Sequence, residues 1–211
     1  MDVSGLEGSV VAPGARSRPL PLVGILLFDG VEVLDFAGPY EVFSGTEDPD
    51  GQPYLRVVTI GPTEEVTARG GLRIRPTHLL SDCPPLDALV VPGGPGADLP
   101  TPVQKDQLLP FLRERAALTP LTASVCTGAF LLGRAGLLDG LSVTTNHHAL
   151  EALAAEFPSA RVDGGKFIDT GRFVTAAGVS SGIDLALHLM HRWFGPEARQ
   201  RAVDGLEGPW S

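Results

Sequence analysis

The residue best suited to chemistry in this chain is Cys126, which lies where a buried strand is expected to run directly into a helix. Residues 121–125 form an apolar strand pattern, and a helical pattern opens at Gly128. A nucleophile elbow has this layout, with a sharp turn, an exposed nucleophile and a small residue that avoids a clash. The N-terminus of a helix also favours a thiolate over a thiol. The alternative is a small buried cysteine with only a packing role.

A glycine-rich loop is expected at the same edge of the sheet. Gly93, Gly94 and Pro95 follow an apolar run at 88–91. Backbone N–H groups in such a loop can approach a ligand closely, and with the amide of Thr127 they predict an oxyanion hole. The loop is too short, and too interrupted by proline, for a dinucleotide fingerprint. We therefore expect no nucleotide cofactor.

An acid follows the first expected strand. Asp35 has apolar neighbours on both sides, a setting in which a carboxyl group can stay partly protonated. Ligands of open α/β sheets bind outside the carboxyl ends of the strands, so Asp35 is expected to meet Cys126 there. The alternative role is an N-cap of a helix that begins near residues 38–39. Glu32 is the rival acid, with a solvated loop position as its default.

Of the histidines, His147 is the one candidate for the site. It follows an expected strand at 141–144, and it could orient the thiolate or contact a substrate. A histidine at a helix start, bonded to the backbone, is an equal alternative. The other histidines lack metal-like spacing with cysteines or carboxylates, so we expect no metal. Cys83 precedes a strand with nothing nearby to lower its pKa, and we interpret it as structural.

These residues require a scaffold in which strands and helices alternate. Continuous apolar runs predict buried strands at 22–28, 55–60, 88–91 and 121–125. Helical periodicity predicts helices at 40–43, 103–117, 128–133, 149–157 and 183–194. Two hairpins, at 65–74 and 166–175, are expected as additions at the sheet edge. The alternation predicts an α/β fold with a parallel sheet and helices on both faces.

Composition and charge narrow the classes of function. The 211 residues are 43% hydrophobic and 19% charged, which fits one globular domain at 21–195. Residues 1–20 are expected to be a disordered leader and 196–211 a C-terminal tail. The net charge of −9 argues against nucleic acid and anionic membrane partners. Two cysteines and no signal-peptide pattern favour a reducing, cytoplasmic location.

Several blocks together resemble the ThiJ/PfpI superfamily, which is glutamine amidotransferase-like. Within it they resemble the branch that contains isonitrile hydratases and the sensor-like domains of AraC-type regulators. The blocks lie at 28–39, 91–94, 124–132, 135–140 and 175–187, so the resemblance covers roughly 22–194. It implies a flavodoxin-like three-layer sandwich with a mainly parallel central sheet, a nucleophile elbow and, usually, a homodimer.

The resemblance also implies an activity. In isonitrile hydratases the matching positions are an aspartate, the elbow cysteine and the following threonine, here Asp35, Cys126 and Thr127. Such an enzyme adds water to an isocyanide, a small-molecule substrate, and gives an N-substituted formamide without a cofactor. The protease-like branch has a histidine directly after the cysteine, so Thr127 argues against a peptidase.

Two other classes stay open. One is a non-enzymatic ligand sensor, which is less expected because the sequence after residue 194 is short for a helix-turn-helix module. The other is a redox or stress protein in which Cys126 is oxidised.

Overall fold

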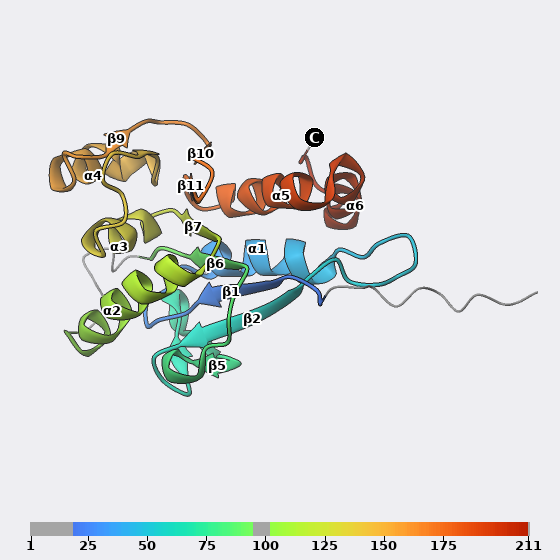
Figure 1. The fold of residues 1–211 in the computed structure, drawn as a ribbon, viewed down its shortest axis with the longest axis horizontal. Coiled ribbons are helices and arrows are strands. Elements are labelled where there is room, and N and C mark those ends of the chain that lie inside the picture. Colours follow the sequence, from blue (N-terminus) through green and yellow to red (C-terminus); the bar gives the residue numbers. More distant parts are fainter. Residues whose placement is uncertain (1–18, 95–101, 211) are drawn as a thin grey trace, which may run out of the picture.

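The computed structural model describes residues 19–94 and 102–210 (Figure 1). Their main sheet has seven strands in the order β10-β11-β7-β6-β1-β2-β5. Every neighbouring pair in it is parallel except β10 and β11. The strands are β1 (Leu22–Leu26), β2 (Arg56–Gly61), β5 (His78–Leu79), β6 (Ala88–Val91), β7 (Leu121–Val125), β10 (Phe167–Asp169) and β11 (Phe173–Ala176).

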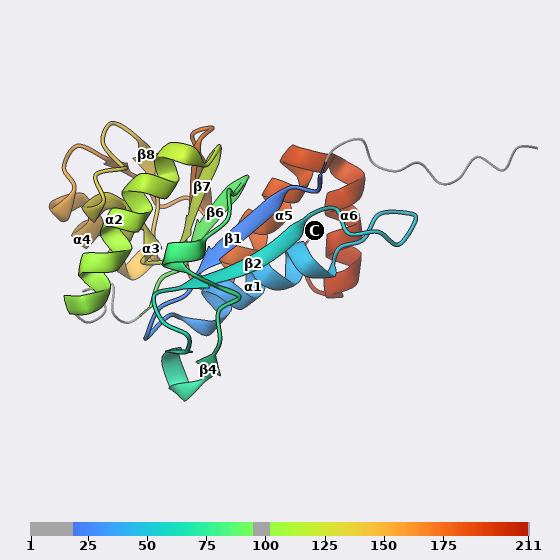
Figure 2. The ribbon, with the colours of Figure 1, turned by 60° about the horizontal axis from the view of Figure 1, so that its bottom comes forward.

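Helices cover both faces of this sheet. Helices α1, α5 and α6 lie together on one face, whereas α2 lies on the other (Figures 1 and 2). The three-layer α/β sandwich predicted from the sequence is therefore confirmed. The helices are α1 (Val33–Gly45), α2 (Pro102–Leu118), α3 (Gly128–Arg134), α4 (Leu150–Glu156), α5 (Ser181–Phe194) and α6 (Pro196–Leu206).

Smaller elements complete the described part of the chain. Strands β3 (Val66–Thr67) and β4 (Arg73–Ile74) form an antiparallel pair, and β8 (Ser142–Val143) and β9 (Arg161–Val162) form a parallel pair. Single 3-10 turns lie at η1 (Arg69–Gly71), η2 (Leu80–Asp82) and η3 (His147–Ala149). None of the described helices is both long and apolar enough to cross a membrane.

The centre of the sheet is formed by β1, β6 and β7, which are apolar except for the buried Thr122 and Ser124 of β7. Every residue of β1, β6 and β7 is buried, as expected for parallel strands that are covered on both faces. Val23, Ile25 and Leu89 have no exposed surface. This rigid centre carries the loops in which the candidate site residues lie.

The two predicted hairpins are both present, but only one of them is a separate addition. The pair β3 and β4 stands apart from the main sheet. Strand β11, by contrast, pairs in parallel with β7 and so extends the main sheet, with β10 at its edge. Val174 and Ala176 are fully buried, which explains why β11 belongs to the core.

Helix α1 begins earlier than the sequence predicts. It starts at Val33, with Glu32 as the N-cap residue and Pro39 inside the helix. Asp35 therefore lies in the first turn and is not an N-cap. Proline removes one backbone hydrogen bond, but the burial of Phe36, Val42 and Phe43 stabilises the helix around it.

The C-terminal segment differs from the predicted tail. Residues 196–206 form α6, which packs against α5 and α1 and buries Ala198 and Ala202. Pro196 occupies the first turn, where its missing N–H costs nothing. The leader expected at 1–20 lies outside the described residues except for residues 19 and 20.

Candidate active site

Cys126 forms the sharp turn that the sequence predicts between β7 and α3. Its φ angle is +56°, a conformation that is uncommon for any residue with a side chain. Its N–H donates to the carbonyls of Ala176 (3.0 Å) and Ala177 (3.1 Å). The hydroxyl of Thr145 donates to the Cys126 carbonyl at 2.7 Å. These bonds hold the strained backbone, and the elbow is thus fixed from β11 and from the chain after β8.

Gly128 is required by the packing of this turn. A Cβ atom at this position would collide with the carbonyl oxygen of Val91 at the end of β6. The predicted reason for a glycine two residues after the cysteine is therefore correct. It allows α3 to start directly against the neighbouring strand.

Asp35 lies close to Cys126, and the glycine-rich loop holds its carboxyl group by a hydrogen bond. The residue has no exposed surface, and its Oδ2 accepts a hydrogen bond from the Gly93 N–H at 3.0 Å. The other carboxylate oxygen of Asp35, Oδ1, is buried and has no hydrogen-bond partner within residues 19–94 and 102–210. The carboxyl group lies near enough to the thiol of Cys126 for each group to shift the pKa of the other. The structure thus brings together the acid and the cysteine.

The pKa values of Asp35 and Cys126 are both raised. Burial raises the pKa of Asp35 to about 7, against the lowering effect of its hydrogen bonds with Gly93 and Cys126; the charge of Glu32 raises it further. Burial also raises the pKa of Cys126 to about 11, and the Asp35 carboxylate raises it further. Burial thus opposes the thiolate that a position before a helix would favour. Near neutral pH, Cys126 is a thiol beside a carboxyl group that is half ionised.

The glycine-rich loop serves a different purpose from the one predicted. The Gly93 N–H bonds to Asp35, and the Gly94 N–H donates to Thr127 Oγ1 at 3.0 Å. The Thr127 hydroxyl in turn donates to the Gly94 carbonyl at 3.1 Å. Both glycine amides are therefore occupied in holding Asp35 and Thr127, and neither is free for a ligand oxygen. Pro95 lies outside the described residues.

Asn146 is a site residue that the sequence reasoning missed. Its Nδ2 donates to Cys126 Sγ at 3.6 Å, and its Oδ1 accepts from the His148 N–H at 3.0 Å. The second bond fixes the orientation of the amide, so an N–H points at the sulfur. The available signal was the position of Asn146 at the start of η3, since asparagine is a preferred N-cap.

Gly178 covers the other side of the thiol. A Cβ atom there would lie 2.7 Å from Cys126 Sγ and 2.8 Å from Asn146 Nδ2. The sulfur is therefore enclosed by backbone and by one amide, and only 7% of Cys126 is exposed. Little space is left around the thiol for a bulky reagent.

Two other predicted candidates do not reach the thiol. His147 is exposed and its ring stacks against that of His148, with a centroid separation of 3.7 Å. The turn η3 directs it away, and Asn146 takes the place expected for it. Glu32, the rival acid, forms an ion pair with Arg69 at 2.5 Å. The charge of Glu32 raises the pKa of Asp35, and its backbone N–H donates to the Gly93 carbonyl at 2.8 Å.

The described residues offer no metal centre. In the parts of the chain that the structure covers, no three His, Cys, Asp or Glu side chains lie close enough together to hold a metal ion. The chemistry that these residues can perform is proton exchange between Asp35 and Cys126, together with nucleophilic attack by the sulfur.

Comparison with known proteins gives this geometry a context. The model of the DJ-1/PfpI family matches residues 22–192. Isonitrile hydratase from Pseudomonas putida is 39% identical over 189 residues, which cover 88% of this chain and 77% of that protein. The HTH-type transcriptional regulator GbdR from Pseudomonas aeruginosa is 31% identical over 190 residues, and the match spans 51% of its length.

Solved structures agree on the fold. A ThiJ/PfpI family protein from Pseudomonas syringae matches with a TM-score of 0.78 and 26% identity, over 90% of this chain and 76% of that one. The family resemblance drawn from the sequence blocks is thus confirmed.

Proposed function

This chain belongs to the DJ-1/PfpI family, and on that premise we propose that it is an isonitrile hydratase. It would add water to an isocyanide and release an N-substituted formamide. The observation that carries the proposal is the buried pair of Asp35 and Cys126, in which a proton donor with a pKa near neutrality stands beside a nucleophile. The isonitrile hydratase at 39% identity supports the same reaction.

The first step is an addition at one carbon atom. Asp35 in its protonated form gives its proton to the terminal carbon of the isocyanide. Cys126 Sγ forms a C–S bond to that carbon, and its thiol proton passes to the Asp35 carboxylate. The product is a thioimidate, R–N=CH–S–Cys126, and the carboxyl group is protonated again. No group leaves and no electron is transferred to another molecule.

The second step consumes water. Asp35 gives its proton to the imine nitrogen and, as the carboxylate, takes a proton from the attacking water. The resulting R–NH–CH(OH)–S–Cys126 then breaks its C–S bond, and the sulfur regains a proton as the hydroxyl carbon becomes a carbonyl. Formamide is released, and both side chains return to their starting states after one water has been added.

The amide donors around the sulfur assist both steps. Hydrogen bonds from the Thr127 backbone and from Asn146 lower the pKa of Cys126, against the larger effect of burial. They stabilise the negative charge that develops on sulfur during attack and again during release. Thr127 is held in place for this role by its two hydrogen bonds to Gly94.

The direct test is turnover of cyclohexyl isocyanide. Purified protein should produce N-cyclohexylformamide, which is detected by NMR. Mass spectrometry of the protein quenched during turnover should find the thioimidate bound to Cys126. Formamide production that persists in Cys126→Ala would overturn the proposed mechanism.

A ligand sensor is the second candidate, because a transcriptional regulator shares 31% identity with most of this chain. The two functions differ in turnover: a sensor would bind a small molecule and leave it unchanged. A homodimer and a cytoplasmic location stay predictions, of which the first is tested by light scattering of the purified protein.

A further inference from the structure

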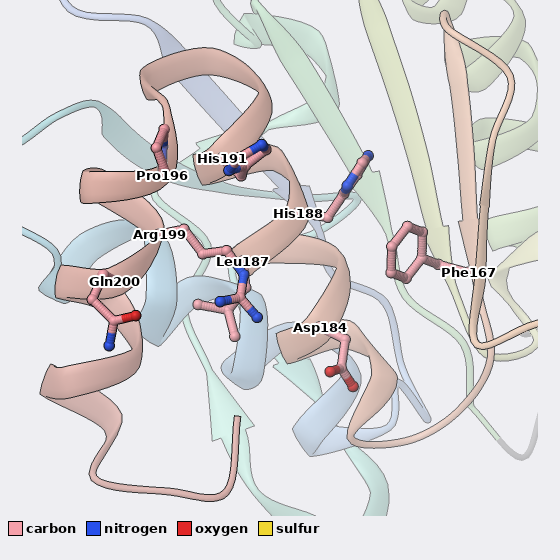
Figure 3. A pocket seen from close by; sticks show the side chains of 8 residues that line it. All are labelled: Phe167, Asp184, Leu187, His188, His191, Pro196, Arg199 and Gln200. Atoms are coloured by element: carbon pink, nitrogen blue, oxygen red, sulfur yellow. The ribbon is translucent and has the colours of Figure 1, made fainter. Parts of the chain in front are cut away.

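A cavity lies away from Cys126, on the face formed by α5, α6 and β10 (Figure 3). Its volume is about 460 Å³, within the range in which small-molecule ligands bind. Leu187 of α5, which is buried, and Phe167 of β10 supply apolar surface. Nothing in the proposed hydration reaction uses this cavity.

Most charged groups around the cavity already have partners. Asp184 pairs with Lys166 at 3.2 Å. Asp169 pairs with His188 at 2.7 Å and with Arg192 at 3.1 Å. The negative charges near the cavity are thus matched by neighbouring cations.

The amide of Gln200 is also engaged, since its Nε2 donates to Asp204 at 2.8 Å. One N–H donor of Gln200 is therefore engaged, as are the carboxylates of Asp184 and Asp169.

Arg199 is the exception. It is half-buried on α6, its Nη2 donates to the Trp210 carbonyl at 3.2 Å, and no carboxylate among residues 19–94 and 102–210 pairs with it. Figure 3 shows its side chain pointing from α6 toward α5, into the space beside Leu187. A guanidinium has five N–H donors in a fixed plane, so most of its donors here have no partner in the described structure.

The imidazole ring of His191, on α5, lines the same cavity and can offer an N–H group to a ligand. It has no ion pair among the described residues. The cavity therefore combines a guanidinium that has no ion pair among the described residues, a histidine ring and an apolar wall.

We propose that this cavity binds a small organic carboxylate, with Arg199 as the charged anchor. The planar guanidinium fits a carboxylate with two parallel hydrogen bonds, a geometry that a point charge does not offer. The wall formed by Leu187 and Phe167 would contact the apolar body of the ligand. The ring of Phe167 is already fixed against His188, with a centroid separation of 4.6 Å, so this wall is preformed.

The experiment titrates the whole ¹⁵N-labelled protein with benzoate and, separately, with benzamide, which has the same shape without the charge. Amide shifts in α5 and α6 should saturate with benzoate, and benzamide should bind at least about tenfold more weakly, as expected for loss of a charge-assisted pair. Arg199→Gln should weaken benzoate binding by a similar factor, and Arg199→Lys by less. Arg192→Gln is the matched control on the same face, and it should change the benzoate affinity less than about twofold, because Arg192 is already paired with Asp169.

Equal binding of benzoate and benzamide to the wild-type protein would overturn the proposal, and so would the absence of saturable shifts in α5 and α6. The wild-type comparison decides the question even if Arg199→Gln does not fold. Light scattering and cross-linking of the same samples test whether a second copy covers α5 and α6. An interface that buries Arg199 would overturn the proposal as well.

Discussion

The two cysteines of this chain are equally buried but have very different neighbours. Cys83 and Cys126 are each 7% exposed, and burial raises the pKa of both thiols. The Cys83 thiol donates to the Pro84 carbonyl at 3.4 Å, whereas Cys126 faces the carboxyl group of Asp35 and an amide of Asn146. Exposure and a low pKa therefore do not distinguish the candidate nucleophile. A buried acid next to the sulfur does.

The largest expected effect is the difference in turnover between the variants of Cys126 and Cys83. Cys126→Ala should lower formamide production by at least about 1,000-fold, because the covalent intermediate cannot form. Cys83→Ala should leave turnover within about twofold and lower the free energy of unfolding by about 1 kcal/mol through lost packing. Turnover is measured by NMR and stability by urea unfolding. A comparable loss of activity in both variants would break the comparison.

The next effect concerns stability and pH. The pKa of Asp35 is raised from 3.8 to about 7 by burial, so the folded protein binds this proton more tightly than the unfolded chain does. This contribution is fully present below pH 3.8 and is lost as pH rises through 7, by up to about 4 kcal/mol.

Asp35→Asn provides the reference for that measurement. Unfolding in urea at a series of pH values should show the wild-type protein losing stability relative to Asp35→Asn between about pH 4 and pH 8. Parallel curves for the two proteins would show that Asp35 does not take up a proton on folding.

A smaller effect is expected on the turnover of Asp35→Asn and on the pKa of Cys126 in this variant. Asp35→Asn should reduce turnover by about 100-fold, since proton transfer by a positioned acid typically contributes that much. It should also lower the pKa of Cys126 below about 11, because the carboxylate that raises it is gone. Iodoacetamide alkylation followed against pH, with each cysteine identified by mass, measures this shift. The pH profile of Cys83 should stay unchanged and serves as the internal control.

The smallest of these effects concerns Asn146. Asn146→Ala removes an N–H donor to the sulfur, which should raise the pKa of Cys126 and reduce turnover by about tenfold. Asn146→Gln moves the amide by one methylene and is the conservative comparison. His147→Ala should leave both quantities unchanged, because His147 is exposed and stacks on His148. A stronger effect from His147→Ala would restore the role predicted for it.

The sequence alone was sufficient for the four strands β1, β2, β6 and β7 and for the meeting of Asp35 with Cys126, but not for the places of β5, β10 and β11 in the sheet. Continuous apolar runs mark strands that are buried on both faces, and parallel strands bring their carboxyl ends to one edge. The start of α1 at Val33 could not be read in the same way, because Pro39 looks like a helix start until the packing around it is known. Helix α6 was missed because its buried residues include two small alanines, Ala198 and Ala202, which give a weak periodic signal.

The protonation states of Asp35 and Cys126 could not be predicted from the sequence either. Local sequence shows a cysteine before a helix, which favours a thiolate, but it shows neither the depth of burial nor the distance to an acid far away in the chain. The hydrogen bonds of Gly93 and Gly94 were hidden for the same reason. Their partners, Asp35 and Thr127, lie far from them in the sequence.

The enclosure of the thiol by Gly178 has a consequence for the shape of the molecules that can react. A methyl group on Gly178 would already touch the sulfur, so the side of the thiol that faces Gly178 has no room for a substituted carbon. The terminal carbon of an isocyanide carries no substituent and lies at the end of a linear rod, whereas the carbon of an ester or an amide is flanked on both sides. In the proposed hydration, the backbone at Gly178 therefore favours a narrow electrophile on this side of the sulfur.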